Sequence, residues 1–138
     1  MTNPSEQLVV AVSSRALFDL ESEHRLFEEQ GYEAFREHQE LNRDKPLRPG
    51  VAFPFVRRLL GLNRLFPGRE PFRVVALSRN SPETACRFFN SCRHHRLPVN
   101  AGAFTSGRSV LPYLKSFDVS LFLSADAEDV QTAVGAGE

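Results

Sequence analysis

The sequence predicts an α/β fold built on a parallel sheet of four or more strands. Two observations lead to this prediction: short apolar runs recur along the 138 residues, and stretches with helical patterning lie between them. Strands that alternate with helices form right-handed crossovers, which place the strands parallel in one sheet. The predicted strands are Leu8–Val12, Arg73–Ser78, Val99–Phe104 and Val119–Leu123.

The segment between the first two predicted strands is much longer than one crossover helix needs. It contains two polar-faced helices, Glu21–Gln30 and Tyr32–Leu41, and a basic, proline-containing loop over 43–50. An apolar helix follows around 53–62. An insertion of this kind, over about 21–63, commonly acts as a cap above a site at the strand ends. The alternative is a group of surface helices without a lid function.

The remaining helices begin at recognisable signals. Ser81-Pro82-Glu83 combines a capping serine, a proline at the first helical position and an acid in the first turn, so a helix is expected from there to about Arg93. A shorter helix is expected over Ser109–Lys115. Asp126 opens a last helix, which breaks at Gly135. Another strand would normally follow, so we expect either the first part of a larger protein or a domain with an unpaired sheet edge.

Composition excludes several classes of function. Seventeen basic residues balance 17 acidic ones, which argues against a nucleic-acid-binding surface. No apolar run approaches the roughly 20 residues that cross a bilayer, so no membrane partner is expected. Cys86 and Cys92 are expected to be reduced thiols, since their spacing on one helix disfavours a disulfide. We therefore expect a single cytoplasmic domain over 1–138.

Polar residues follow each predicted strand and form the candidate site. The carboxyl ends of parallel strands meet at one edge of a sheet, where ligands of α/β proteins bind. Arginines bind phosphate through paired hydrogen bonds, and the helix that starts at Ser81 adds free amides. The alternative is that these residue types only cap helices and form turns. The predicted phosphate-binding residues are Ser13, Ser14, Arg15, Ser78, Arg79, Asn80, Ser106, Gly107 and Arg108.

The same strand ends lack the groups that phosphate transfer needs. A phosphatase that forms an aspartyl-phosphate requires a carboxylate directly after its first strand, but the first acid here is Asp19. Mg²⁺ is usually held by one or two carboxylates, and Asp126 is better placed to cap a helix. No catalytic residue and no metal ligand are therefore expected. His24 and His38 lie among acids on polar helices, where solvated surface is expected.

Five segments, in the same order and at compatible spacing, resemble the type I cytosolic 5′-nucleotidases, which are haloacid-dehalogenase-like (HAD-like) phosphatases. The segments are AVSSRALFDLESEH, PLRPGVAFPFVRRLLGLN, VVALSRNS, RFFNSCRHH and LFLSADAEDV. The resemblance runs from about Leu8 to Gly137 and implies a Rossmann-like (HAD-like) fold with a small helical cap. The reaction it implies is hydrolysis of nucleoside 5′-monophosphates such as AMP, with Mg²⁺ and an aspartate nucleophile.

The resemblance is to the N-terminal half of those proteins, whereas their catalytic Asp-x-Asp motif lies in a second, related half. When the chain is laid on that second half, the phosphate-binding hydroxyl falls on Ser78. The two aspartates fall on Val12 and Ser14. The lysine falls near Val110, beside Arg108, and the metal-binding acids fall on Ser124 and Ala125. The resemblance thus implies a degenerate half that supports a catalytic half or pairs with itself and holds no Mg²⁺ alone. It could bind a nucleoside monophosphate or phosphate. The alternative is a stand-alone, non-catalytic phosphate-binding or scaffold domain.

Overall fold

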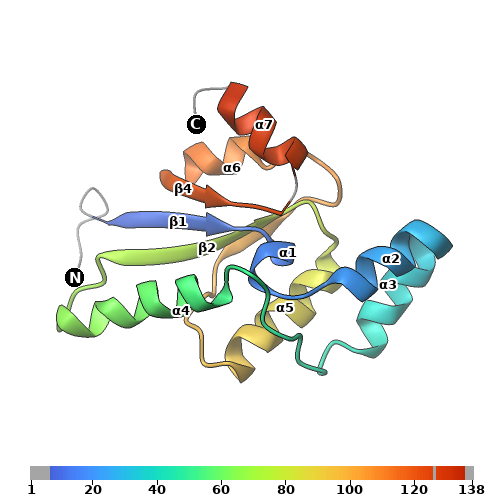
Figure 1. Ribbon diagram of the computed structural model, residues 1–138, viewed down its shortest axis with the longest axis horizontal. Coiled ribbons are helices and arrows are strands. Elements are labelled where there is room, and N and C mark those ends of the chain that lie inside the picture. The colour runs from blue at the N-terminus through green and yellow to red at the C-terminus, as the bar shows by residue number, and fades with distance from the viewer. Residues whose placement is uncertain (1–6, 126, 136–138) are drawn as a thin grey trace.

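The computed structural model describes residues 7–125 and 127–135. Its centre is a four-stranded sheet in the order β3-β2-β1-β4, with every neighbouring pair parallel (Figure 1). The strands are β1 (Leu8–Val12), β2 (Phe72–Ser78), β3 (Gly102–Phe104) and β4 (Val119–Leu123). The predicted Rossmann-like α/β fold with a parallel sheet is confirmed.

Side chains of the central strands alternate between two hydrophobic clusters. In β1, Val10 and Val12 belong to one cluster, whereas Val9 and Ala11 belong to the other. Because successive side chains of a strand point to opposite faces, each cluster lies on one face of the sheet. A strand buried on both faces reads as a continuous apolar run, which is why β1 was recognisable from the sequence.

Two helices cover each face of the sheet. They are α4 (Phe53–Gly61) and α5 (Pro82–His94) on one face, and α6 (Leu111–Ser116) and α7 (Ala127–Gly135) on the other (Figure 1). Val56 of α4 and Phe88 of α5 are fully buried in the first cluster, and Leu114 of α6 and Ala133 of α7 lie in the second. None of the helices in the described ranges is long and apolar enough to span a membrane.

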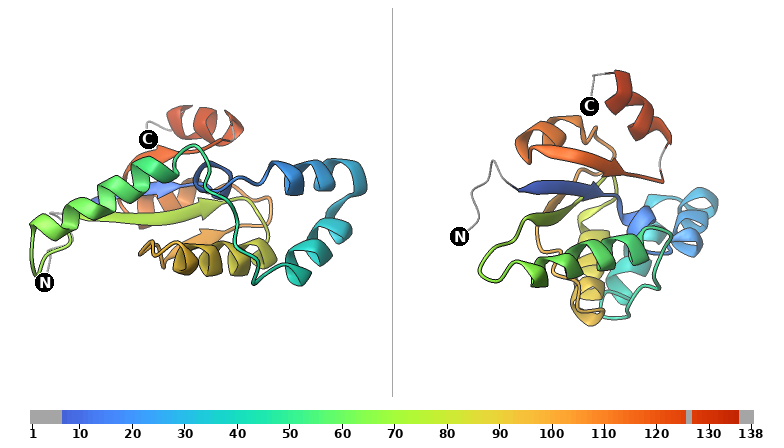
Figure 2. Two further views of the ribbon diagram at one scale, coloured as in Figure 1. Left: turned by 60° about the horizontal axis from the view of Figure 1, so that its bottom comes forward. Right: turned by 60° about the vertical axis from the view of Figure 1, so that its left-hand side comes forward.

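A helical hairpin lies beyond the carboxyl end of β1. Its helices are α2 (Glu21–Gln30) and α3 (Tyr32–Leu41), with the bounds that the sequence predicts. Gly31 joins them at φ 87°, a backbone conformation that a side chain would strain. The hairpin stands away from the sheet (Figure 2, left), and α4, although part of the same insertion, packs on the sheet itself.

Two short elements were not predicted. The one-turn helix α1 (Ser14–Leu17) follows β1 directly, and the 3₁₀ helix η2 (Leu62–Leu65) extends α4. Helix α1 is too short to show an apolar period, and it forms because the hydroxyl of Ser13 accepts a hydrogen bond from the amide of Ala16. As a result the residues after β1 belong to a turn whose amides and side chains have fixed directions.

The strand β3 is shorter than the predicted Val99–Phe104. Val99 is buried in the first cluster, but pairing with β2 starts only at Gly102, opposite Ala76. The chain crosses from the end of α5, where Arg96 has φ 58°, before it reaches the sheet. A side chain at position 102 would lie 2.1 Å from the Ala76 carbonyl oxygen, so this close pairing requires glycine.

The other helix boundaries follow the predictions closely. Helix α5 begins after Ser81, whose hydroxyl accepts a hydrogen bond from the Thr84 amide at 3.3 Å, as the capping signal predicts. Helix α6 begins at Leu111, later than expected, since Ser109 lies in the preceding loop. Helix α7 ends at Gly135, and Asp126, its expected cap, lies outside the described residues.

Candidate functional site

A cavity of about 590 Å³ lies at the carboxyl ends of the strands, and we call it the strand-end cavity. The strand ends form one wall of the cavity, which is its polar floor. Helices α2 and α3 and the loop before them form its second wall. Its volume falls within the range of roughly 300–1,000 Å³ that is usual for small-molecule sites. The lining residues are Ser13, Ser14, Arg15, Leu20, His24, Phe27, Tyr32, Phe35, Ser78, Arg79, Asn80, Ser81, Ser106 and Gly107.

Three residues from two strand ends form a hydrogen-bonded cluster on the floor. The hydroxyl oxygens of Ser14 and Ser78 lie 2.8 Å apart, and the Asn80 side-chain amide donates to Ser14 Oγ at 3.1 Å. The backbone amide of Asn80 donates to Ser78 Oγ at 3.1 Å. Ser14 and Ser78 are buried and 64 residues apart in the chain, so the parallel pairing of β1 with β2 is what brings them together. We call this trio the hydroxyl cluster.

Arg15 places a cation beside the hydroxyl cluster. It lies on α1, and its Nη2 is 3.5 Å from Glu21 Oε1, a partly exposed ion pair. Its Nε is buried, and no hydrogen-bond acceptor for it lies among the described residues. An unpaired buried N–H is costly, and an oxygen of a bound anion would satisfy it.

Ser13 and Ser81 have structural partners. Ser13 Oγ accepts from the amides of Ala16 and Ala125, at 3.2 Å and 3.3 Å, and Ser81 caps α5. For these two residues the capping function weighed in the sequence analysis is therefore present. Their hydroxyls line the cavity but already take part in holding the loops together.

The loop after β3 closes the cavity from the side. The amides of Ser106 and Gly107 donate to the carbonyls of Asn80 and Arg79, at 3.1 Å and 2.7 Å. Ser106 and Gly107 both have positive φ values, which turn the chain sharply at this point. Arg108, predicted with this group, is exposed and is not among the lining residues. All the other predicted phosphate-binding residues line the cavity.

The second wall consists of residues that the sequence analysis did not assign to a site. Leu20 and Phe35 are buried, His24 is half-buried, and the side chains of Phe27 and Tyr32 are 44% and 45% exposed. The expectation that His24 is only solvated surface needs correction, because it lines the cavity. The spacing of Leu20, His24 and Phe27 corresponds to one helical face, and this signal could have indicated the wall.

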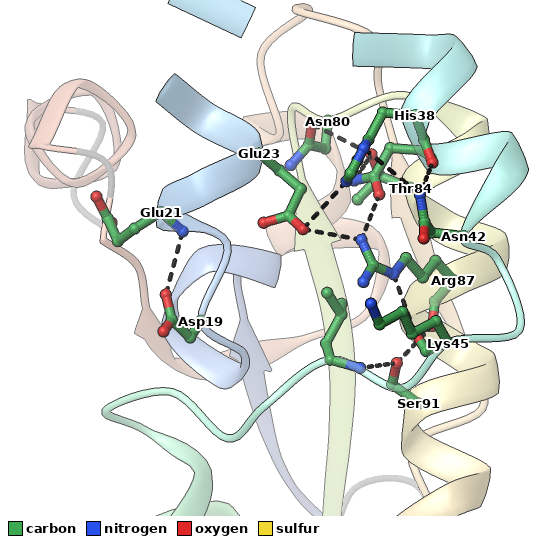
Figure 3. Close-up of polar contacts among 12 residues, drawn as sticks. Asp19, Glu21, Glu23, His38, Asn42, Lys45, Asn80, Thr84, Arg87 and Ser91 are labelled. Carbon is green, nitrogen blue, oxygen red and sulfur yellow. Dashed lines mark hydrogen bonds and ion pairs between the residues drawn. The ribbon is translucent and has the colours of Figure 1, made fainter. Parts of the chain in front are cut away.

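A buried polar network holds the helical hairpin to the rest of the domain (Figure 3). Arg87 of α5 donates from Nη1 to Glu23 Oε1 of α2 and to Gln39 Oε1 of α3, both at 2.9 Å. Its Nε donates to the carbonyl oxygen of Lys45 at 3.0 Å. The side chains of Arg87 and Glu23 are only 6% and 10% exposed. His38, expected on the solvated surface, lies 3.5 Å from the Glu23 carboxylate.

The groups around the cavity do not fit Mg²⁺. The lining residues of the described ranges supply hydroxyls, one amide, an imidazole and guanidinium groups, and no carboxylate. Mg²⁺ prefers carboxylate and water oxygens, and a neighbouring guanidinium repels it. Within residues 7–125 and 127–135, no group of three or more His, Cys, Asp and Glu side chains is arranged to hold a metal.

Comparison with known proteins places these features in context. The family model of 5′-nucleotidases matches residues 1–138. Human cytosolic 5′-nucleotidase 1B is 32% identical over 139 aligned residues, which cover 97% of this chain and 23% of that protein. The chain therefore spans about a quarter of the length of this relative. No solved structure matches.

Proposed function

Because this chain belongs to the 5′-nucleotidase family, we propose that it is a non-catalytic half of such an enzyme. Its strand-end cavity would bind the phosphate group of a small ligand without hydrolysing it, and the domain would support a catalytic half. The reaction of the family, hydrolysis of a nucleoside 5′-monophosphate, would then take place outside this region.

One observation carries the proposal: the hydroxyl cluster and Arg15 stand where a phosphatase of this kind needs a carboxylate. A covalent phosphoryl intermediate requires an activated nucleophile. Among the described residues, the hydrogen-bond partners of Ser14 Oγ are Ser78 and Asn80, and neither of these side chains is a base. Hydroxyls, an amide and an unpaired guanidinium N–H can nevertheless hold phosphate oxygens in place.

Inorganic phosphate titrated by calorimetry tests the proposal. Arg15→Ala should weaken binding by about 1.5–3 kcal/mol, the scale of a hydrogen bond to a charged group, or roughly 10- to 150-fold. Arg15→Lys should recover only part of the loss, since lysine lacks the planar fork. Arg36→Ala is the matched control, because Arg36 lies on α3 and pairs with Glu33 and Glu40.

Two results would contradict the proposal. One is equal phosphate affinity in the wild-type protein and in Arg15→Ala. The other is the absence of phosphate binding by the wild type at millimolar concentration. The first result would show that Arg15 does not contact the phosphate. The second would favour the alternative, in which the strand-end residues only cap helices and form turns and the domain acts as a scaffold.

A further inference from the structure

The basic loop that follows the helical hairpin lies against the C-terminal half of α5, and the two segments form one positively charged surface. Residues 43–48 and 90–96 carry one carboxylate, Asp44, and five exposed Lys and Arg side chains, and we call them the basic surface. The cations are Arg43, Lys45, Arg48, Arg93 and Arg96. We propose that the basic surface binds an acidic protein segment, and that an apolar side chain of this segment enters a groove between Arg43 and Arg93.

The groove, which we call the side groove, has a volume of about 470 Å³ and lies apart from the strand-end cavity. Its apolar part comes from one face of α5, and charged and amide side chains form its rim. Phe89 is half-buried, and its ring packs edge-on against Phe88 and Phe104, with centroids 5.1 Å and 5.9 Å away. The apolar part is therefore continuous with the core. The lining residues are Arg43, Asp44, Ala85, Cys86, Phe89, Asn90 and Arg93.

The charge of the basic surface is not neutralised within the described part of the chain. None of its five cations has a carboxylate within ion-pair distance among residues 7–125 and 127–135, whereas Arg36 on the hairpin pairs with both Glu33 and Glu40. The Arg93 guanidinium donates to Asn90 Oδ1, a neutral acceptor that leaves its charge uncompensated. Carboxylates of a partner would thus meet cations without competing acids, which is how arginine clusters recognise acidic segments.

The loop is held in place before any partner arrives. Side chains of α5 bind its backbone at four points: Asn90 donates to the Arg43 carbonyl, Arg87 to the Lys45 carbonyl, His95 to the Leu47 carbonyl, and Ser91 accepts from the Leu47 amide, all at 2.9–3.0 Å (Figure 3). These bonds fix the loop backbone and leave the charged side chains exposed. A surface that is already ordered loses little backbone entropy when a partner binds.

A protein segment fits the basic surface better than a nucleic acid does. A nucleic acid needs a basic track along its backbone and flat aromatic faces on which bases stack. Here Asp44 lies on the rim of the groove, where it would repel a phosphate, and the Phe89 ring is partly covered by its aromatic neighbours. The whole chain also has equal numbers of basic and acidic residues. An acidic segment with one apolar side chain supplies carboxylates for the arginines and a group that fills the groove.

Fluorescence anisotropy of a short fluorescein-labelled peptide, made of Asp and Glu with one central leucine, tests the proposal on the full chain. The double variant Arg43→Glu, Arg93→Glu should bind it at least about tenfold more weakly, because each exposed ion pair contributes up to about fivefold and the reversed charges repel. Replacing the leucine of the peptide by alanine should weaken binding by about threefold or more. The matched control is Arg25→Glu, Arg58→Glu, which makes the same change in net charge at exposed positions of α2 and α4 and should keep the wild-type affinity.

Cys86 reports where the peptide binds, because its thiol is exposed and lines the side groove. The peptide should slow the alkylation of Cys86 by iodoacetamide in the wild-type protein and leave it unchanged in the double variant. This measurement needs no mutation of the wild-type chain, so it holds even if the double variant is misfolded. Thermal unfolding checks the fold of both variants.

Several results would overturn the inference. They are no binding of the peptide by the wild type, equal affinity in the wild type and the double variant, equal affinity for the leucine and alanine peptides, and unchanged labelling of Cys86. Tighter binding of a single-stranded oligonucleotide through the same arginines would assign the basic surface to nucleic acid instead. Salt-dependent self-association that the double variant loses would assign it to the acidic hairpin of a second copy. None of these results affects phosphate binding at Arg15, which is tested separately.

Discussion

Burial gives the two cysteines of α5 different chemistry. Cys86 is exposed, whereas Cys92 is fully buried in the cluster that α4 and α5 form on the sheet. Burial raises the pKa of the Cys92 thiol from 9.0 to about 12, because the thiolate cannot be solvated there. Since the thiolate is the nucleophile, we expect only Cys86 to react readily in the folded protein.

Alkylation with iodoacetamide at pH 8 should therefore label Cys86 rapidly and Cys92 only after unfolding. Similar labelling rates for both thiols in the native protein would contradict this prediction.

The raised pKa of Cys92 also has a consequence for stability. The thiol of Cys92 contributes fully below pH 9, where both states are protonated, and its contribution is lost as the pH rises toward 12. The free energy of unfolding should fall more steeply over this range in the wild-type protein than in Cys92→Ala. An equally steep fall in the two proteins would contradict this expectation.

Single residues also show why the site could be predicted only in part. Ser14, Arg15 and Asn80 were recognised because they directly follow strands, and the ends of parallel strands share one edge by topology. The contact of Ser14 with Ser78 follows from that topology. The second wall of the cavity did not follow, because the direction of the hairpin depends on contacts with α5 that the local pattern of α2 and α3 does not contain.

Among the helices, the hairpin is held to α5 by a buried polar network that includes the ion pair of Glu23 with Arg87. Glu23 lies on a helix that the sequence predicts as polar-faced, and its partner Arg87 is 64 residues away. The bounds of α2 and α3 were predictable because helix formation is local, whereas this pairing is not. The short β3 has a similar explanation, since Val99 is apolar and buried but enters the core as part of a loop.

Removing the carboxylate of Glu23 should destabilise the protein strongly. In Glu23→Ala, Arg87 keeps Gln39 and the carbonyl of Lys45 but loses its charge partner in a buried site. Breaking such a pair typically costs about 3–5 kcal/mol of the free energy of unfolding. The matched control is Glu33→Ala, which breaks the exposed pair with Arg36 and should change stability far less. Urea denaturation measures both variants, and equal losses would show that the buried pair does not hold the hairpin.

At the scale of the whole molecule, the fold is a parallel α/β domain with a cavity at its strand ends. The sheet order, the cavity at the strand ends and a helical hairpin beside it all agree with a HAD-like domain. The sequence predicted this fold because the signals for buried strands and for helix caps depend on residues that are close together in the sequence. The altered chemical positions that the resemblance implies stay a prediction. The side-chain packing that closes the cavity could not be predicted, because it depends on contacts between distant segments.

The purified chain should accordingly release no phosphate from AMP, with or without Mg²⁺. The two residues after β1 are Ser13 and Ser14. The Ser13 hydroxyl accepts hydrogen bonds from the amides of Ala16 and Ala125, and the Ser14 hydroxyl is hydrogen-bonded with Ser78 and Asn80. Neither hydroxyl is hydrogen-bonded to a base among the described residues, and no carboxylate among the described lining residues could hold the metal. A phosphate-release assay at high protein concentration is the measurement. Any trace activity of the wild-type protein must be compared with that of Ser14→Ala, because the resemblance places the second aspartate of the catalytic motif at position 14. Turnover that survives repurification and disappears in Ser14→Ala would show that the serine performs chemistry, whereas activity equal in both proteins would come from a contaminating enzyme.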